Sequence, residues 1–320
     1  RLGVDLAFYN NITRNQILDV PMDQTTGYTQ ATMNSGKVRN RGVELQLDGT
    51  PIKTGDFTWN ATFTWAKNYN KVLSLASGLK DGQIIAYTGG TNCALIAKVG
   101  GSIGDMYGYK LKRAPDGQVV WKDGITACPT EIEYVGNAYP AWKAGFSNEF
   151  AYKNFRVSIL FDGQWGGIVY SQTHHKMTEH GTLKHTLKYR ENPNFEVVGE
   201  GVMLNENGQY VPNNVPISVS KYYGDYWRRA NVETNSFDAS FLKLREARIE
   251  YTIPAKRLNK IGVERLTFAL YGRNLAMWTK NFPVYDPEVA TLNSGTIVPG
   301  SEMGQLPSTR TMGFNLTLKF

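Results

Sequence analysis

The sequence ends with Arg310-Thr-Met-Gly-Phe-Asn-Leu-Thr-Leu-Lys-Phe320, the stretch that decides the fold. Apolar residues occupy every second position from Met312 to Phe320. The positions between them include the polar residues Asn315, Thr317 and Lys319. Successive side chains of a strand point to opposite faces, so this stretch is predicted to be a strand with one apolar and one polar face. A soluble sheet with such a flat apolar edge strand invites aggregation. A transmembrane β-barrel has no free edge, so the stretch favours a barrel.

The same alternation recurs along the chain and predicts about eight strands. Besides the last stretch, the strands are expected within residues 2–9, 43–48, 57–65, 142–152, 155–161, 237–253 and 266–271. In 237–253, Leu242 and Leu244 are out of phase with Ala247 and Ile249. We therefore place a β-bulge near residues 243–246, because one extra residue restores the phase; the alternative is that the strand leaves the apolar zone there.

The connections between these strands differ in length in a regular way. Short turns are expected near residues 49–56, 153–154 and 254–264. Long loops are expected at about 10–37, 67–140, 165–236 and 280–308. Short periplasmic turns and long extracellular loops are typical of outer-membrane barrels. We interpret residues 1–320 as one portion of an all-β, antiparallel transmembrane barrel.

The two faces of the predicted strands differ in chemistry. One face carries aromatic residues suited to lipid: Trp59, Phe63, Trp65, Trp142, Phe146 and Phe161. The other carries polar and charged residues: Asp5, Glu44, Gln46, Asn60, Lys143, Glu149, Arg156, Asp162, Arg248 and Glu250. Buried charges would be costly in a dry core but are ordinary in a water-filled lumen.

Composition limits the alternatives. No run of about 18 apolar residues exists, so no transmembrane helix is expected. No secretory signal is recognised, and the chain is expected to be a mature or truncated piece. The net charge of +7 fits a solvated basic surface or contact with anionic lipid headgroups. No basic run interleaves with aromatics as in a nucleic-acid-binding module, so nucleic acid is not an expected partner.

Several short motifs occur in a characteristic order. They are Asn34-Ser-Gly36, Val38-Arg-Asn-Arg-Gly-Val-Glu-Leu45, Phe57-Thr-Trp59, Gly199-Glu-Gly-Val202, Leu244-Arg-Glu246, Gly272-Arg-Asn-Leu275, Asp286-Pro-Glu288, and the terminal Pro307, Arg310 and Phe320. In this order and spacing the chain resembles the carboxy-terminal part of the SusC/RagA-type TonB-dependent outer-membrane transporters of Bacteroidetes.

The resemblance implies a larger protein. Barrels of this family have 22 strands and an amino-terminal plug, so this chain would supply about the last eight strands. The implied partners are a SusD-like lipoprotein lid, the TonB protein through a segment outside this chain, the outer-membrane assembly machinery, and lipid or lipopolysaccharide. The implied substrates are oligosaccharides or peptides, and a dimer of transporter–lipoprotein pairs is also implied. Phe314, Leu316, Leu318 and Phe320 would form the assembly signal.

Candidate substrate-binding residues come from the long loops and the polar face. Aromatic rings stack on sugar rings and suit peptide side chains, and mutual packing of the loops is the alternative. The candidates are Trp165, Tyr170, Tyr222, Tyr223, Tyr226 and Trp227 in the loops, and Lys143, Arg156 and Asp162 on the polar face.

The remaining reactive residues suggest no catalytic site. Cys93 and Cys128 lie in one presumptive loop, where an exported protein is expected to form a disulfide, the alternative being two unpaired thiols. The four histidines, His174, His175, His180 and His185, match no zinc motif and are expected on a solvated loop. Asp286-Pro-Glu288 is interpreted as a turn lock. We expect no enzyme activity, cofactor or metal.

Two other functions remain open at this stage. A passive porin or a small eight-stranded barrel fits the strand count alone. A soluble β-rich glycan-binding protein fits the aromatic loops. The motifs favour active import.

Overall fold

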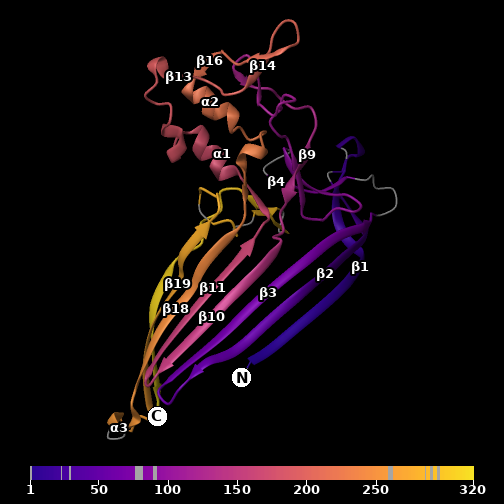
Figure 1. Ribbon diagram of the computed structural model, residues 1–320. Coiled ribbons are helices and arrows are strands. Elements are labelled where there is room, and N and C mark those ends of the chain that lie inside the picture. The colour runs from indigo at the N-terminus through magenta and orange to yellow at the C-terminus, as the bar shows by residue number, and fades with distance from the viewer. Residues whose placement is uncertain are drawn as a thin grey trace.

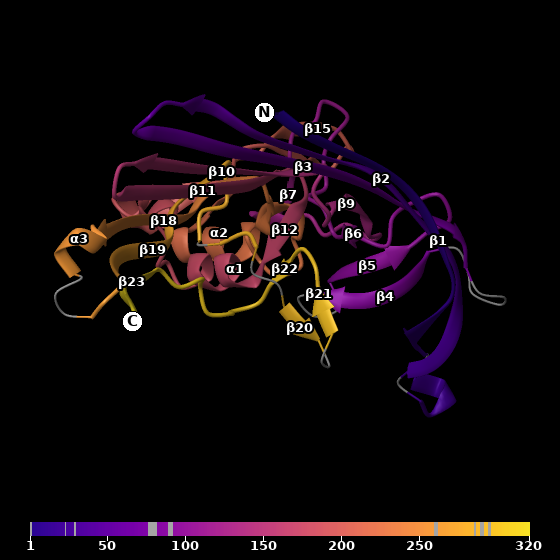
Figure 2. The ribbon, with the colours of Figure 1, turned by 90° about the horizontal axis from the view of Figure 1, so that it is seen from below.

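The fold is organised around one eight-stranded antiparallel sheet. The computed structural model describes residues 2–22, 24–28, 30–75, 82–88, 92–258, 262–284, 286–288, 291–293 and 296–320. The strands follow one another across the sheet in the order in which they occur in the chain (Figure 1). They are β1 (Leu2–Pro21), β2 (Gln30–Lys53), β3 (Phe57–Ser74), β10 (Trp142–Tyr152), β11 (Phe155–Trp165), β18 (Phe241–Ile253), β19 (Arg265–Thr279) and β23 (Thr311–Lys319). Figure 2 shows this sheet as an arc, which confirms the predicted eight-stranded barrel wall.

The register preserves the two faces that the sequence predicts. Phe146 pairs with Phe63 on one side and with Phe161 on the other, so aromatic side chains share one face. Many large side chains of this apolar face are exposed, among them Phe8 (72%) and Phe314 (72%). A wall with its apolar face outward in lipid and its polar face toward the lumen accounts for this pattern. We call these the outer and inner faces.

The predicted β-bulge is present in β18. The pairing of β18 with β11 shifts where Leu160 pairs with Glu246 and Phe161 pairs with Leu244, so Arg245 is the extra residue. Leu244 pairs with Phe161, and Ala247 pairs with Ile159 on the same outer face. The bulge therefore keeps both halves of the strand in phase.

The connections lie at two ends of the sheet. Residues 54–56, 153–154 and 254–264 connect strands at the end that carries α3 (Ala255–Leu258) in Figure 1. The long connections lie together at the opposite end.

One loop expectation was wrong. Residues 10–37 are mostly paired strand, and β1 and β2 pair as far as Pro21 and Gln30. Of the described residues between the two strands, 24–26 form the short helix η1 (Gln24–Thr26). Apolar and polar residues do not alternate regularly in this extension, so the period-two signal is lost while the backbone pairing continues.

The long connections were expected to be irregular, but they contain small sheets and short helices. The small strands are β4 (Gln83–Thr88), β5 (Cys93–Ala97), β6 (Asp105–Gly108), β7 (Val120–Lys122), β8 (Ile125–Thr126), β9 (Glu133–Asn137), β12 (Ile168–Ser171), β13 (Glu196–Val198), β14 (Val202–Leu204), β15 (Tyr210–Pro212), β16 (Pro216–Ser218), β17 (Ser236–Asp238), β20 (Thr291–Asn293), β21 (Thr296–Val298) and β22 (Ser301–Glu302). The helices are α1 (Gln172–Glu179), α2 (Val219–Tyr226), η2 (Lys184–Leu187), η3 (Pro193–Phe195) and η4 (Glu233–Asn235).

The three connections share one core. Cys93 and Met106 from the first, Tyr170 and Val232 from the second and Val298 from the third pack in one buried cluster. We call this assembly of residues 75–141, 166–240 and 280–310 the loop unit. Among the described residues, none of the helices is both long and apolar enough to span a membrane.

Candidate functional site

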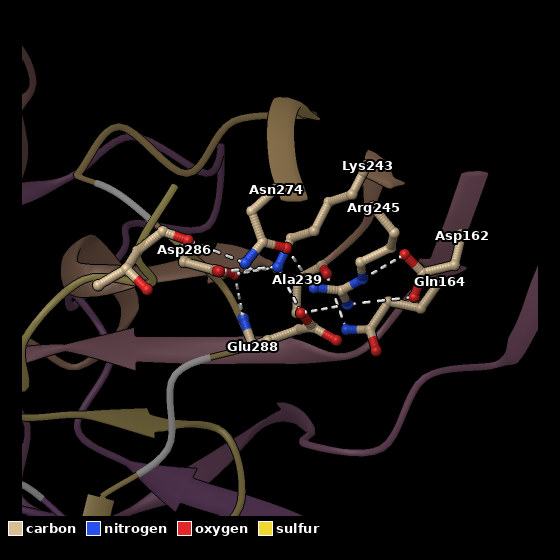
Figure 3. Close-up of polar contacts among 9 residues, drawn as sticks. Asp162, Gln164, Ala239, Lys243, Arg245, Asn274, Asp286 and Glu288 are labelled. Carbon is tan, nitrogen blue, oxygen red and sulfur yellow. Dashed lines mark hydrogen bonds and ion pairs between the residues drawn. The ribbon is translucent and has the colours of Figure 1, made fainter. Parts of the chain in front are cut away.

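A charged network occupies the inner face next to the bulge (Figure 3). The Nζ of Lys243 lies 2.7 Å from Oδ1 and 2.7 Å from Oδ2 of Asp286, and it also contacts Glu288 Oε2. Lys243 pairs with Asp162 across β18 and β11, so its side chain faces inward. The network thus binds the connection between β19 and β23 to the wall.

Arg245, the bulge residue, joins the two carboxylates that flank it. Its Nε lies 2.5 Å from Asp162 Oδ1, and its Nη2 lies 2.5 Å from Glu288 Oε2. A further bond runs from Nη1 to Asn274 Oδ1 at 3.3 Å. The planar guanidinium suits such multiple bonding, so Arg245 fixes the position of Glu288 relative to β11.

The network favours the charged form of the Asp286 carboxylate. Burial alone would raise the pKa of Asp286, but hydrogen bonds from Lys243, Ser308 and the Glu288 amide lower it below its ordinary value. The side chains of Lys243 and Asp286 are each only 3% exposed. A buried ion pair of this kind is costly to break from one side only, so we interpret it as an anchor for the loop.

The wall beside this anchor contains a hollow of about 440 Å³ whose lining includes several charged residues. Asp5, Glu44 and Gln46 from the first strands and Lys143 from β10 line it, together with Asp162 and Glu288. Lys143 is exposed, so its ammonium can meet a polar solute in the lumen. Asp162 is already bonded to Arg245 and is therefore a positioning group for the network.

Arg156, another candidate, lies far from this hollow. It follows the turn at residues 153–154, at the end of the sheet opposite the loop unit. Its Nη1 lies 3.7 Å from Glu149 Oε2 on the neighbouring strand. The structure therefore does not bring Arg156 together with Lys143 and Asp162.

Four of the six aromatic candidates pack together in the loop unit. Tyr222 and Tyr226 stack with Trp121 at ring-centroid distances of 6.0 Å each. Trp227 stacks with Tyr223 at 5.5 Å. A smaller hollow of about 300 Å³ borders this group, and its lining includes Tyr222, Tyr223 and Trp227. Much of the aromatic surface is therefore used in packing.

The positions of the other two aromatic candidates do not fit the expected contact with substrate. Tyr170 is fully buried in the core of the loop unit, so its ring cannot reach a solute. Trp165 pairs with Trp142 on the outer face, where their rings stack at 6.3 Å. Trp165 lies four residues after Phe161 in the same strand, so the alternation of the sequence already indicated that both side chains point to the outer face.

The expected disulfide is also wrong. No bond joins Cys93, buried in β5, to Cys128, which is exposed beyond β8. The Sγ of Cys128 instead accepts a hydrogen bond from Arg228 Nη2 at 3.2 Å. Cys93 lies in the small sheet of β4, β5, β6 and β9, whereas Cys128 follows β8 of a different sheet, which separates two positions that share one connection.

Three of the four histidines do not lie on a solvated loop, contrary to expectation. His174 and His175 are buried in the first half of α1, and His185 is half-buried in η2, whereas His180, at the carboxy-terminal cap of α1, is exposed. His174 Nδ1 lies 2.9 Å from Asn235 Oδ1, and burial lowers the pKa of His174 to about 4. In the described part of the chain, no group of three or more His, Cys, Asp or Glu side chains is arranged to hold a metal ion.

Sequence reasoning missed Lys243 and Arg245. Their only signal was the phase change that predicted the bulge. Asp286 and Glu288 were interpreted as a turn lock, and the Glu288 amide does donate to Asp286 Oδ1 at 2.9 Å. Their cationic partners lie more than 40 residues away in the sequence, so composition alone could not connect them.

Comparisons with known proteins agree with this architecture. No family model matches the chain. TonB-dependent receptor P26 of Formosa agariphila is 27% identical over 347 residues, which cover 100% of this chain and 33% of the relative. TonB-dependent receptor SusC of Bacteroides thetaiotaomicron is 26% identical over 181 residues, covering 52% of this chain and 18% of SusC.

Solved structures show the same fold. The RagAB peptide importer in the closed-closed state matches with a TM-score of 0.72 at 20% identity, over 100% of this chain and 34% of the other. Another structure, of the RagAB peptide transporter, gives a TM-score of 0.70 at 20% identity, over 100% of this chain and 34% of the other. The chain therefore spans about a third of the length of receptor P26 and of the matching chains in the RagAB structures.

Proposed function

Because the chain is the carboxy-terminal part of the barrel of a SusC/RagA-type TonB-dependent receptor, we propose that the whole receptor imports oligosaccharides or peptides actively across the outer membrane. The single observation that carries this proposal is the wall itself. Its outer face is apolar and its inner face is polar, with fixed charges beside a hollow. Such a wall suits a water-filled path through lipid.

The orientation follows from the two ends of the sheet. Outer-membrane barrels have short periplasmic turns and long extracellular loops. The loop unit would therefore lie outside the cell, and the turns at 54–56, 153–154 and 254–264 would face the periplasm. The protein would be a multi-pass β-barrel of the bacterial outer membrane.

The partners are part of this proposal. A SusD-like lipoprotein would cover the extracellular mouth, above the loop unit, and paired copies of the two proteins would form a dimer. TonB would act through a segment outside this chain. The likeness to SusC and to the RagAB peptide importer supports a lipoprotein-covered transporter, and the substrate class follows from the same likeness.

Lys143 is the residue of this chain that we place in contact with substrate. It is exposed on the inner face, and two separate hollows include it in their lining. An ammonium in this position would attract anionic or hydroxyl-rich solutes. Tyr222, Tyr223, Tyr226 and Trp227 would act from the loop unit through those ring faces that packing leaves accessible.

The test is uptake by cells that carry the whole receptor as the sole importer. Labelled oligosaccharides and labelled peptides are supplied separately, with and without functional TonB. Active import predicts that uptake of one class is lost when TonB is absent. Uptake that continues without TonB, together with high conductance of the whole receptor in planar bilayers, would support a passive porin instead.

A charge reversal in this chain sharpens the test. Lys143→Glu should raise the half-saturating concentration for an anionic substrate about tenfold, because attraction becomes repulsion within the hollow. Lys153→Glu is the matched control, since Lys153 lies in a turn at the other end and its side chain is 57% exposed. Equal effects of the two variants would remove Lys143 from the substrate path.

A further inference from the structure

A second hollow lies on the outer face, across the wall from the polar site. It has a volume of about 510 Å³, and its lining spans β3, β10, β11, β18 and β19. The lining is mostly aromatic and aliphatic: Phe63, Trp142, Phe146, Phe161, Trp165, Leu242 and Trp278. Each of these strands has a neighbouring strand on both sides in the sheet, so this chain completes the hollow by itself.

The floor of the hollow is made by small residues. Ala144 pairs with Gly163, and Gly163 pairs with Leu242 in the next strand. Phe146 and Phe161 form the row on one side, and Trp142 and Trp165 form the row on the other. Because Ala144 and Gly163 are small and lie between two rows of aromatic side chains, the outer face is recessed here. We call this recess the notch.

The notch lies where the wall meets the loop unit. Trp142 begins β10, and Trp165 ends β11. Trp278 lies next to the last residue of β19. Aromatic girdles of this kind mark the boundary between hydrocarbon and headgroups in outer-membrane barrels. The notch therefore opens into the acyl region, with the headgroup region directly above it.

The ammonium group of Lys280 lies at the edge of the notch nearest the loop unit. The Nζ of Lys280 lies 5.6 Å from the centre of the Trp165 ring and 2.7 Å from Asp238 Oδ2. The Lys280 side chain remains 56% exposed, so a lipid phosphate can reach the ammonium. The apolar notch suits a hydrocarbon chain, and the ammonium at its rim suits an anionic group, so the two together fit an amphipathic anion.

From this geometry we infer that the outer face carries a specific lipid-binding site. One acyl chain of an anionic outer-membrane lipid occupies the notch over Ala144 and Gly163, and its phosphate contacts Lys280. Lipid is the occupant because the outer face of a barrel lies in lipid, which fills any hollow there. The inference needs insertion into the membrane but not import, so uptake results leave it unaffected.

The test measures lipid that remains bound to the whole receptor after purification in a mild detergent. Mass spectrometry counts lipids of each headgroup class per receptor. Ala144→Leu should lower the bound lipid about tenfold, because the new side chain fills the notch. Ala247→Leu is the matched control, since Ala247 has the same outer orientation on β18 and lies away from the notch lining. It should leave the count unchanged.

A second pair of variants distinguishes the contribution of the lipid headgroup from that of the acyl chain. Lys280→Gln should lower bound anionic lipid about threefold and leave zwitterionic lipid unchanged. Lys256→Gln, at an exposed position of α3 at the opposite end, should change neither. Heat-modifiable gel mobility confirms that each variant is folded. Equal lipid counts in wild type, Ala144→Leu and Ala247→Leu would overturn the inference, as would a co-purifying protein in place of lipid.

Discussion

The Nζ of Lys243 lies 2.7 Å from both carboxylate oxygens of Asp286, and each side chain is 3% exposed. Lys243 belongs to the wall, and Asp286 belongs to the connection between β19 and β23. This pair therefore fixes one part of the loop unit to the inner face. A buried pair is strongly destabilised when only one partner is removed, because the other charge is left without compensation.

We expect Lys243→Met to loosen this connection. Loss of one partner of a buried pair costs about 3–5 kcal/mol, so local opening should become roughly a hundredfold to a few thousandfold more frequent. Limited proteolysis of the folded receptor measures this as a faster cleavage within residues 280–310.

Two variants control that experiment. Lys243→Met combined with Asp286→Leu should be cleaved more slowly than Lys243→Met alone, because no buried charge then lacks its partner. Lys176→Gln should leave cleavage within about twofold of wild type, since Lys176 and Glu179 form an exposed pair. A Lys243→Met receptor as resistant as wild type would contradict the anchor.

Acid should destabilise the loop unit through its buried histidines. Burial lowers the pKa of His174 from 6.5 to about 4, and it also lowers the pKa values of His175 and His185. The unfolded loop then binds more protons than the folded one, so stability falls as the pH drops from about 6.5 to 4. For His174 alone the full loss is about 3 kcal/mol. Hydrogen exchange of α1 at pH 7 and pH 5, corrected for intrinsic rates, measures it.

The environment of His174 explains why a neutral side chain is needed. Its ring lies 5.3 Å from the His185 ring and 4.8 Å from the Phe237 ring, and Asn235 accepts its hydrogen bond. His174→Gln should flatten much of the pH dependence, whereas His180→Gln should leave it intact because His180 is exposed. Protection that is equal at both pH values in wild type would refute the proposed cause.

Gly42 should be intolerant of a side chain. It pairs with Tyr9, and a Cβ at Gly42 would lie 2.4 Å from Tyr9 Oη and 2.5 Å from the Lys67 carbonyl oxygen. Gly42→Ala should therefore destabilise the sheet by about 1–3 kcal/mol. Gly3→Ala is the control, because its Cβ would meet Asp48 at an ordinary 3.6 Å. The readout is the temperature at which the whole receptor loses its compact gel mobility, and equal values would contradict the steric reason.

The sequence predicted the wall well because one physical constraint acts on every strand. Each strand separates lipid from water, so alternation appears in residues such as Phe57 to Trp65 and survives the bulge at Arg245. Where the hairpin of β1 and β2 leaves the apolar zone, this constraint ends and the prediction failed.

The loop unit and the site were predicted poorly for a related reason. Small strands such as β7 and β8 are two or three residues long and carry no readable period. Their order depends on contacts between distant segments, as when Tyr170 meets Val298 in the core. Lys243 and Asp286 likewise meet only after the connection folds back onto the wall.

The last strand leads to a prediction about assembly. In β23, Phe314, Leu316 and Leu318 pair with Leu270, Phe268 and Leu266, which places them on the outer face. Phe320 follows the strand and is 79% exposed, so its ring contributes little to packing within this chain. We expect the assembly machinery to recognise this apolar row together with the Phe320 ring.

Deleting Phe320 should therefore lower the amount of receptor in the outer membrane several-fold and leave transport per inserted molecule nearly unchanged. The reason is that an exposed ring outside the ladder adds little to the folded wall, whereas a recognition step can depend on it entirely. Quantitative blotting of outer membranes, combined with uptake per receptor, separates the two quantities. Lys319→Gln is the control, because it removes only the exposed pair of Lys319 with Glu264 and should leave the receptor level unchanged. A normal receptor level with impaired uptake after deletion of Phe320 would instead assign the terminal ring to transport.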